Sequence, residues 1–492
     1  MSYSSNNHNY KFFLSWDRTF TNYIKKEDGM ENHNVEPLDS DHLRILSSSS
    51  FRRLQDKTQL FPLEKNDYAR TRLTHSCEVA ATARSISNCA VKIMKSRDNP
   101  YLYRDTFIRL PDISYLSSLL HDIGNPPFGH YGEEIIRDYF IKNWEELEYL
   151  YNGKTKKLKD LFPVKDKEYW DFCGFDGNAQ ALRVISKLER YGDDPCGLNL
   201  TMSVMSGIIK YPFDSKSAFD VLGKNKFGYF QSELDVIDRL RGYNLFIDNN
   251  RSAIPYIVEA ADDISMAISD FEDGVKKGCI TYRDIEKYDG SSAQEVIDFK
   301  ERFKKHYFEN AESQNEEPMI ATSIRMLNAL RNDLVRDAAS SFVKMISTWN
   351  VPYPIAFDDP VLPKPLIEDS SKYPIVKMLG DIVKDKVYQD EQIVAPELKG
   401  QLILSTLLEK MLKAVLNLSV SDIASPKAKL EYNKISKLIS KNYIDGFIKE
   451  INLSRSFDNK EKTEVYLKLR LVVDQLSGMT DSYAEQVYRK IS

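Results

Sequence analysis

Two histidines, an aspartate and two glutamates are concentrated in one short stretch, LLHDIGNPPFGHYGEE (residues 119–134). The chain has only seven histidines, and a third, His75, lies upstream in RTRLTHSCEVA. Imidazole and carboxylate groups together bind divalent ions such as Mn, Fe, Zn or Ni, and they also act as general acids and bases. The types and spacing of these residues therefore indicate a metal site and a proton-transferring pair.

A metal site of this kind needs ligands from more than one helix. His121 and Asp122 are adjacent, and adjacent helical side chains diverge by about 100°, so both reach one ion only beside the helix flank. His75 offers a second imidazole, and EAADDISMAISDFED (259–273) places Asp262 in an otherwise apolar segment. In the alternative interpretation these residues are structural. Asp122 then forms hydrogen bonds with the following loop, and the His75 ring is hydrogen-bonded within the core.

The elements that must position these side chains are helices. Apolar residues recur at steps of three and four over 73–94 and 112–123, which predicts one apolar stripe on each of two helices. Gly124 and the Pro126-Pro127 pair must end the second helix. Further helices are expected at 130–140, 178–190, 254–273, 318–347, 394–417 and 463–476. The predicted fold class is all-α.

Segments without helical periodicity are few. FGYFQS (227–232) is the best candidate for a small hairpin or an extended loop, and the lysine-rich run 153–160 is expected to be a solvated loop. The charged, aromatic segment 142–173 and the proline-rich stretch 350–366 are expected to be surface connections.

Composition fits a soluble globular protein of 492 residues, with 42% hydrophobic and 29% charged residues. No apolar run reaches the roughly 18 residues of a membrane span, and the polar N-terminus lacks a signal-peptide layout, so a cytoplasmic location is expected. With a net charge of −5, a triphosphate or a nucleic acid must find a local basic patch. The cysteines are expected to be reduced thiols without metal-ligand spacing: Cys77, Cys89, Cys173, Cys196 and Cys279.

Four stretches, RTRLTHS, LLHDIGNPPFGHYGEE, GFDGNAQALR and EAADDIS, resemble in order and spacing the HD-domain deoxynucleoside triphosphate triphosphohydrolases, in particular bacterial dGTPases. SSFRRLQDKTQLFPLE (49–64) and LRLVVDQLSGMTDSYA (469–484) resemble the two ends of the same family. The resemblance implies an HD-domain helical core followed by a large C-terminal helical extension. We expect an N-terminal region and catalytic core over 1–290. Residues 291–492 are then a helical region that completes the nucleotide pocket and an oligomer surface.

By position, the resemblance implies a divalent ion, Mn²⁺ or Mg²⁺ with Fe, Ni or Zn as alternatives. Its ligands would be His75, His121, Asp122 and Asp262, with Asp263 turned away or behind the ligands.

The family's catalytic pair corresponds to His130 and Glu133. Their spacing of three residues on one helix lets the side chains meet, so Glu133 can hold the imidazole in one tautomer and raise its basicity. The alternative role of Glu133 is a first-turn carboxylate that stabilises the helix N-terminus, and the two roles are compatible.

The substrate contacts implied by the resemblance fall into three groups. Cations and an amide would bind the triphosphate, although each lysine could instead be an ordinary surface residue. Gln59, Leu60 and Asp270 would contact the sugar, Asp270 accepting from its 3′-hydroxyl. Glu397 would lie near the base, where a carboxylate suits the N–H donors of guanine; a solvated helix residue is the alternative. The implied triphosphate contacts are Arg72, Asn178, Lys210 and Lys226.

The sequence departs from the family pattern at two positions. Met266 stands where relatives have a tyrosine that packs on the sugar, and Gly174 stands where some relatives have a histidine. These departures bear on sugar discrimination and on an auxiliary imidazole, respectively.

The expected function is metal-dependent hydrolysis of dGTP, and of other dNTPs in addition, to a deoxynucleoside and inorganic triphosphate. One alternative is a phosphodiesterase or nucleotidase on the same scaffold. Another is a non-catalytic regulator that holds a nucleotide or single-stranded DNA. The resemblance also implies a homo-oligomer, often a hexamer, with single-stranded DNA as a further partner and no membrane contact.

Overall fold

The computed structural model describes residues 36–64, 66, 68–96, 108–189, 197–223, 225–243, 251–313, 317–348, 364–425, 431–453 and 459–491. These residues form helices, apart from their connections and one two-stranded sheet, which confirms the all-α prediction. In this part of the chain, no helix is long and apolar enough to cross a membrane.

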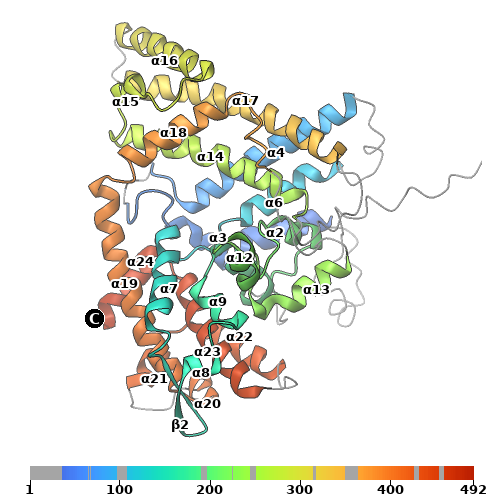
Figure 1. Cartoon of the computed structure of the whole chain (residues 1–492), viewed down its shortest axis with the longest axis vertical. Helices are drawn as coiled ribbons and strands as arrows, with labels where there is room; N and C mark the ends of the chain where they lie inside the picture. Colours follow the sequence, from blue (N-terminus) through green and yellow to red (C-terminus); the bar gives the residue numbers. More distant parts are fainter. Residues whose placement is uncertain are drawn as a thin grey trace, which may run out of the picture.

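The helices divide between two hydrophobic cores, one above the other in Figure 1. In the upper core, α4 packs against α6, α14 and α17, and α14 packs against α18. The helices of this core are α2 (Pro37–Ser47), α3 (Ser49–Arg53), α4 (Arg72–Ser96), α6 (Leu110–Leu120), α11 (Met202–Gly207), α13 (Leu234–Gly242), α14 (Ile254–Lys276), α15 (Tyr282–Lys287), α16 (Gln294–Glu312), α17 (Pro318–Thr348) and α18 (Tyr373–Lys386).

In the lower core, α19 packs against α7 and α23, and α22 packs against α23. Between the cores, α10 (Gly177–Arg183) continues into a π-helical turn, Val184–Leu188. The helices of the lower core are α7 (Gly129–Asn143), α8 (Leu158–Leu161), α9 (Lys167–Cys173), α12 (Ser215–Leu222), α19 (Glu391–Leu416), α20 (Val420–Ala424), α21 (Glu431–Ser436), α22 (Lys441–Leu453), α23 (Lys460–Ser477) and α24 (Asp481–Ile491).

The C-terminal half of the chain contributes to both cores, because α16–α18 pack in the upper core and α19–α24 in the lower one. The division into 1–290 and 291–492 stays a prediction. Of the proline-rich stretch 350–366, only 364–366 belong to the described residues.

Periodicity located the long helices correctly. The segments predicted at 73–94, 254–273 and 318–347 correspond to α4, α14 and α17. α14 shows why: it begins with a proline in its first turn, where no backbone donor is lost, and its buried apolar residues recur at helical spacing. These residues are Ile257, Ala260, Ala261, Ile264, Ile268, Phe271 and Val275.

Of the two structures expected for 227–232, a small hairpin or an extended loop, the extended loop is confirmed. That segment is extended, makes one isolated bridge from Tyr229 to Asp214, and ends in a 3₁₀ turn, Gln231–Glu233. The hairpin pairs β1 (Glu148–Tyr151) with β2 (Lys154–Lys157) instead. Its turn is Asn152-Gly153, with φ angles of 49° and 74°. Asn-Gly is the strongest short hairpin signal, because both turn residues need positive φ; the sequence contained this signal.

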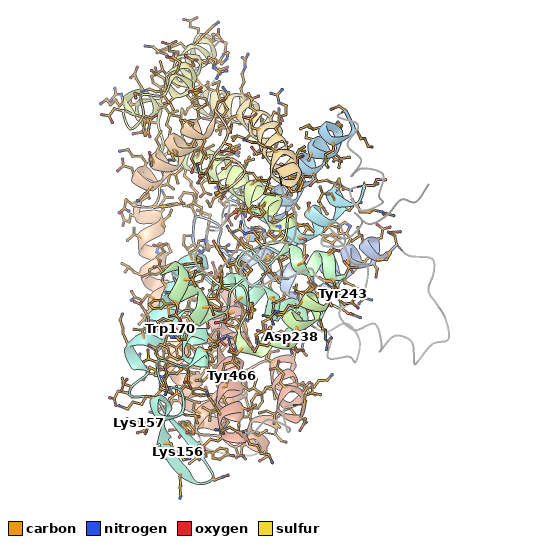
Figure 2. All side chains as sticks on the ribbon, turned by 45° about the vertical axis from the view of Figure 1, so that its right-hand side comes forward. Lys156, Lys157, Trp170, Asp238, Tyr243 and Tyr466 are labelled. Atoms are coloured by element: carbon orange, nitrogen blue, oxygen red, sulfur yellow. The ribbon has the colours of Figure 1, made fainter. Side chains whose placement is uncertain are left out.

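The expectation that 142–173 is only a surface connection is also wrong. Tyr149, Phe162 and Phe172 from this segment are buried in the lower core, so it carries both the hairpin and α8–α9. The run 153–160, expected to be a solvated loop, instead forms β2 and the start of α8, although most of its residues are exposed. Lys156 and Lys157 lie at the lower end of the molecule in Figure 2. They pair with glutamates there, Lys156 with Glu461.

A buried cluster of charges ties the two cores together. The Arg183 guanidinium on α10 donates to both carboxylate oxygens of Asp474 on α23, at 2.7 and 2.8 Å. It also pairs with Glu233 at 2.9 Å and Glu450 at 3.1 Å. Because Arg183 is buried next to upper-core residues and Asp474 next to lower-core residues, this cluster fixes α10 against α23.

We expect Arg183→Met to lower the free energy of unfolding by about 3–5 kcal/mol, because it leaves carboxylates buried without their cation. Arg183→Lys keeps the charge but loses the two-pronged geometry, so its free energy of unfolding should fall by less than that of Arg183→Met. Denaturant midpoints of the purified variants measure both effects.

The matched control is Lys216→Met, which breaks the exposed pair of Lys216 and Asp220 on α12. Its effect should stay below about 1 kcal/mol. An Arg183→Met midpoint as close to wild type as that of the control would contradict a joining role for the cluster.

Candidate active site

Three helices of the upper core bring together three of the predicted metal ligands. His75 lies on α4, His121 directly follows α6, and Asp262 lies on α14. Each offers one ligand atom, and the three atoms lie within 4.8 Å of one another. His75 Nε2 is 3.1 Å and His121 Nε2 is 3.6 Å from the same oxygen, Asp262 Oδ1. This group can hold a metal ion.

The His121 ring is oriented as a metal ligand requires. Its Nδ1 lies 2.7 Å from the Ser118 carbonyl oxygen, which can only accept, so Nδ1 carries the proton. The lone pair is then on Nε2, which is buried without a hydrogen-bond partner among the described residues. Buried polar atoms are normally paired, and fixing one imidazole nitrogen with a carbonyl is how proteins orient the other toward a metal.

Asp122, the fourth predicted ligand, lies at the edge of this group. Its Oδ2 is 3.6 Å from His121 Nε2 and accepts from Arg72 Nη1 at 2.5 Å. Its other oxygen accepts from Asn125 Nδ2 at 2.6 Å. Burial by itself would raise the pKa of Asp122, but the charge of the Arg72 guanidinium holds it well below the usual range. The carboxylate is therefore charged and fixed in place.

The two aspartates on α14 differ in their ionisation. For Asp262, the nearby His121 and His75 outweigh the effect of burial and lower its pKa to about 2. For Asp263, burial and the adjacent Asp262 charge raise the pKa to about 7. The site therefore favours Asp262 as the anionic ligand. Asp263 points to a different place, the cavity that Met266 also lines.

The chain reverses sharply between the metal-ligand group and α7. Phe128 and Gly129 have φ angles of 62° and 58°, and the Phe128 N–H donates to Asp481 Oδ1 at 3.0 Å. A Cβ atom on Gly129 would lie 2.3 Å from Arg72 Nη2. Glycine is therefore required here, both for the backbone conformation and to leave room for the Arg72 side chain that holds Asp122.

This reversal places the predicted catalytic pair at the start of α7. His130 Nδ1 lies 3.6 Å from Glu133 Oε2; the His130 side chain is 72% exposed, whereas that of Glu133 is 2% exposed. Glu133 Oε1 accepts from the Gly177 N–H at 3.0 Å. The interaction with Glu133 raises the pKa of His130. Burial opposes ionisation of Glu133, but His130 more than compensates and lowers its pKa to about 2.

The predicted phosphate ligands lie around these two groups. Lys226 Nζ is 3.8 Å from Glu133 and 3.7 Å from Asp176, and Asn178 donates to Asp176 at 2.7 Å. Lys210 lies 3.3 Å from Glu259, and Tyr211 together with nearby carboxylates raises its pKa despite its burial. The structure thus brings cations to the site, each with a carboxylate nearby.

The residues predicted to contact the sugar lie in two separate places. Met266 and Asp270 line a cavity of about 230 Å³, where Asp270 accepts from the Tyr388 hydroxyl at 3.3 Å. Gln59 and Leu60 belong to a segment held beside the start of α4, since the Arg72 N–H donates to the Lys57 carbonyl oxygen at 3.1 Å. Gln59 Oε1 is buried without a partner among the described residues, so an acceptor is available in this segment.

Glu397 is half-buried on α19, and burial together with the neighbouring Glu134 raises its pKa. It is not among the described residues that line the cavity at Met266. Its role at the base stays a prediction.

Sequence reasoning missed several residues that shape this site. Asn125 fixes Asp122, and Tyr388 bonds Asp270. Asp176 caps α10 and lies near Lys226. The Asp-Gly-Asn order after Phe175 is a helix-start signal that could have located Asp176. The role of Gly177 depends on contact: a Cβ there would lie 2.1 Å from Asn125 Oδ1 and 2.6 Å from Glu133 Oε1.

Comparison with known proteins places these residues in a family. The HD domain profile matches residues 72–162, which include His75, His121 and Glu133, and a phosphohydrolase-associated domain profile matches residues 423–490. Asp262, on α14, lies outside both matched ranges.

Relatives are similar over nearly the whole length. The deoxyguanosinetriphosphate triphosphohydrolase-like protein of Listeria innocua is 34% identical over 493 residues, 97% of this chain and 99% of the relative. The probable deoxyguanosinetriphosphate triphosphohydrolase of Pseudomonas aeruginosa is 30% identical, covering 93% of each chain. The deoxyguanosinetriphosphate triphosphohydrolase of Klebsiella pneumoniae is 29% identical, covering 97% of each chain. The chain therefore belongs to the HD-domain deoxyguanosinetriphosphate triphosphohydrolase family and is a metal-dependent phosphohydrolase.

Proposed function

We propose that the protein hydrolyses dGTP to deoxyguanosine and inorganic triphosphate. The observation that carries this proposal is the group of His75, His121 and Asp262, whose ligand atoms lie within 4.8 Å of one another, with His121 Nε2 buried and unpaired. The names of the relatives support dGTP as the substrate. In this proposal the protein also hydrolyses other dNTPs, with lower turnover.

In this proposal, His75, His121, Asp122 and Asp262 hold a divalent ion, Mn²⁺ or Mg²⁺ before Fe, Ni or Zn. Such an ion polarises a phosphoryl oxygen and makes a water more acidic. In this hydrolysis, the oxygen of a water forms a bond to the α-phosphorus and loses a proton to solvent, while the bond between the α-phosphorus and the 5′-oxygen breaks. The 5′-oxygen leaves as an alkoxide and needs a proton. Protonated His130 donates that proton, and Glu133 keeps His130 protonated and oriented.

The remaining residues bind the ends of the substrate. Arg72, Lys210 and Lys226 neutralise the triphosphate, since charge-assisted hydrogen bonds to phosphate are short and strong, and Asn178 adds an amide donor. Asp270 accepts from the 3′-hydroxyl, while Gln59, Leu60 and Met266 contact the sugar. Glu397 is proposed for the guanine edge.

Incubation of the full chain with each dNTP and Mn²⁺, followed by chromatography of the products, tests the proposal. We expect deoxyguanosine and triphosphate from dGTP. Release of orthophosphate or of a monophosphate would indicate the nucleotidase or phosphodiesterase alternative. Binding without any turnover would indicate a non-catalytic regulator. The homo-oligomer, the contact with single-stranded DNA and the cytoplasmic location stay predictions.

Two histidine variants should separate metal binding from proton transfer. His121→Ala removes a ligand, so both bound metal and activity should be lost together. His130→Ala should retain metal while kcat falls by roughly 10²–10⁴, the usual contribution of general acid–base catalysis. Metal content by mass spectrometry and turnover of dGTP are measured on the same preparations. A His121→Ala protein with normal metal content would refute the ligand assignment.

The pH profile should report on Glu133. Because Glu133 raises the pKa of His130, the protonated acid persists to higher pH, and kcat/KM should fall only as pH rises through that raised pKa. Glu133→Gln removes the charge but keeps an acceptor for the Gly177 N–H. We therefore expect the alkaline limb of the profile to move to lower pH.

Glu133→Asp is the matched control, because it keeps the charge and should move the limb less. An alkaline limb that stays in place in Glu133→Gln would exclude His130 as the acid.

A further inference from the structure

The first residue of α24, Asp481, is buried where two segments of the proposed active site pass each other. Its side chain is 2% exposed. One carboxylate oxygen, Oδ1, accepts from the Phe128 N–H at 3.0 Å. The other, Oδ2, accepts from the Thr58 N–H at 3.0 Å and also from the Thr58 hydroxyl. A single side chain from the C-terminal helix therefore binds two segments that are far from each other in the sequence.

The bond to Phe128 completes the start of α7. Phe128 is the N-cap residue of α7, and its φ of 62° is a conformation that residues other than glycine rarely adopt. In a capping box, the side chain of the third helical residue accepts from the N–H of the N-cap residue. In α7 the third residue is Tyr131, whose hydroxyl donates to Gln401 on α19. Asp481 supplies the acceptor from another helix, and it thereby holds the turn that carries His130.

The bonds to Thr58 fix the segment that follows α3. Gln59 and Leu60, which are proposed to contact the sugar, come directly after Thr58. Thr58 also forms an isolated bridge to Thr71, one residue before α4 begins. Because the same carboxylate binds Phe128 on one side and Thr58 on the other, it sets the position of the sugar contacts relative to the turn at the start of α7.

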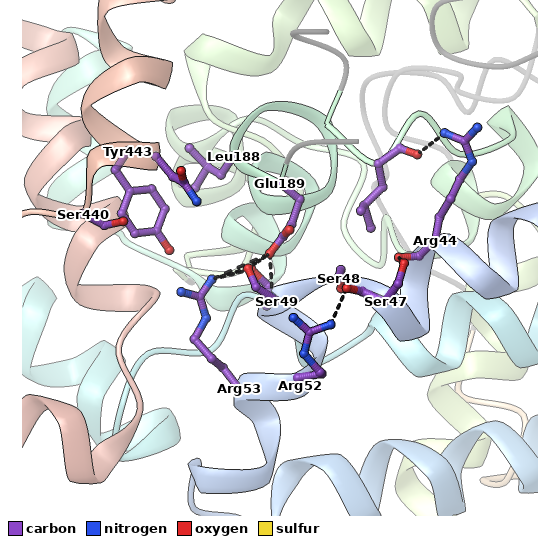
Figure 3. A pocket seen from close by; sticks show the side chains of 13 residues that line it. Arg44, Ser47, Ser48, Ser49, Arg52, Arg53, Leu188, Glu189, Ser440 and Tyr443 are labelled. Atoms are coloured by element: carbon purple, nitrogen blue, oxygen red, sulfur yellow. Dashed lines mark hydrogen bonds and ion pairs between the residues drawn. The ribbon is translucent and has the colours of Figure 1, made fainter. Parts of the chain in front are cut away.

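The helix before this segment is held by other contacts. Figure 3 shows Arg53 of α3 directed at Glu189, with a distance of 3.7 Å between the charged groups. The Ser50 N–H donates to the same carboxylate at 2.6 Å. These contacts come from outside α24, so α3 should stay in place when Asp481 is changed. The loss of the Asp481 bonds should therefore displace the short segment around Thr58 without unfolding the helix before it.

We propose that Asp481 is a positioning residue for the hydrolysis reaction. It holds the turn that carries His130, the proposed proton donor, and the segment that contacts the sugar in one fixed arrangement. This inference rests on the roles proposed above for His130 and Gln59. A displacement of about 1 Å caused by a mutation far from the reacting atoms can lower a rate by roughly 10²-fold. The loss of one acceptor behind the site should therefore be measurable in the kinetics.

Asp481→Asn tests the proposal in the full chain, because one amide oxygen cannot accept from both segments. Its NH₂ group must face either the Phe128 N–H or the Thr58 N–H, and the bond on that side is lost. We expect kcat/KM for dGTP with Mn²⁺ to fall by about 10–100-fold, while the bound metal stays at the wild-type content. Steady-state kinetics and metal content by mass spectrometry are measured on the same preparation.

Two variants of Thr58 isolate the sugar-contacting segment. Thr58→Val removes only the hydroxyl donor, so KM should rise by about threefold to tenfold, the scale of one hydrogen bond, with kcat nearly unchanged. Thr58→Ser keeps the hydroxyl and should have the wild-type KM. Thr58 is only half-buried, so both variants should fold.

Ser482→Ala is the matched control. It removes the bond from Ser482 Oγ to Asp56 Oδ1, at 2.9 Å, which joins the same two parts of the chain one residue along. The bonds of Asp481 to Phe128 and Thr58 remain, so kcat and KM should both keep their wild-type values.

Amide hydrogen exchange provides a readout that does not depend on turnover. In Asp481→Asn, the peptides that contain Phe128 and Thr58 should together show faster exchange than in the wild-type protein or in Ser482→Ala. The wild-type products test the proposed function, whereas the exchange rates and the ratios of variant to wild-type constants test the positioning role, so the two can fail separately. Wild-type exchange and a kcat/KM within about twofold of wild type in Asp481→Asn would overturn the proposal. An equally large loss of kcat/KM in Ser482→Ala would also overturn it, because any contact of α24 would then suffice.

Discussion

The junction between the two cores depends on buried charge pairing at Arg183. An apolar contact of similar volume would stabilise the fold as well or better, but it would allow α10 to slide against α23. The two-pronged bond to Asp474 allows one alignment only. α10 begins six residues earlier at Gly177, whose N–H donates to Glu133. The alignment of α10 therefore also positions Glu133, a member of the proposed catalytic pair.

The site lies at this junction because its metal-ligand group and its proposed proton-transfer pair belong to different cores. His75, His121 and Asp262 project from upper-core helices that pack on one another, whereas His130 and Glu133 begin α7 in the lower core. The segment between Asp122 and Gly129 joins them. It is held by Asp481, which accepts from the Phe128 N–H, and by Lys57, whose ammonium donates to the carbonyl oxygens of Asn125 and Ser477 at 2.5 and 2.7 Å.

Burial and neighbouring side chains together set the protonation states on which the proposed chemistry depends. Asp262 and Glu133 are ionised because imidazoles nearby outweigh the cost of removing a carboxylate from water. Burial raises the pKa of Asp270 to about 6, and the Tyr388 hydroxyl bonds it. Tyr388 comes from outside α14, so a tyrosine is present at this cavity although residue 266 is methionine.

The sequence by itself determined the helices and the chemical types at the site. Periodicity predicted α4, α14 and α17, and the order of the motifs carried the family resemblance. A local signal needs only a few adjacent residues. The Asn152-Gly153 pair is such a signal, and it indicates the turn of the hairpin. Only the tertiary structure decided which polar groups meet. The fixed proton on His121, the contact of Gly177 with Asn125, and the pairing of Arg183 with Asp474 join residues that no local pattern relates. Such contacts depend on how helices pack, and packing is settled by the whole core at once.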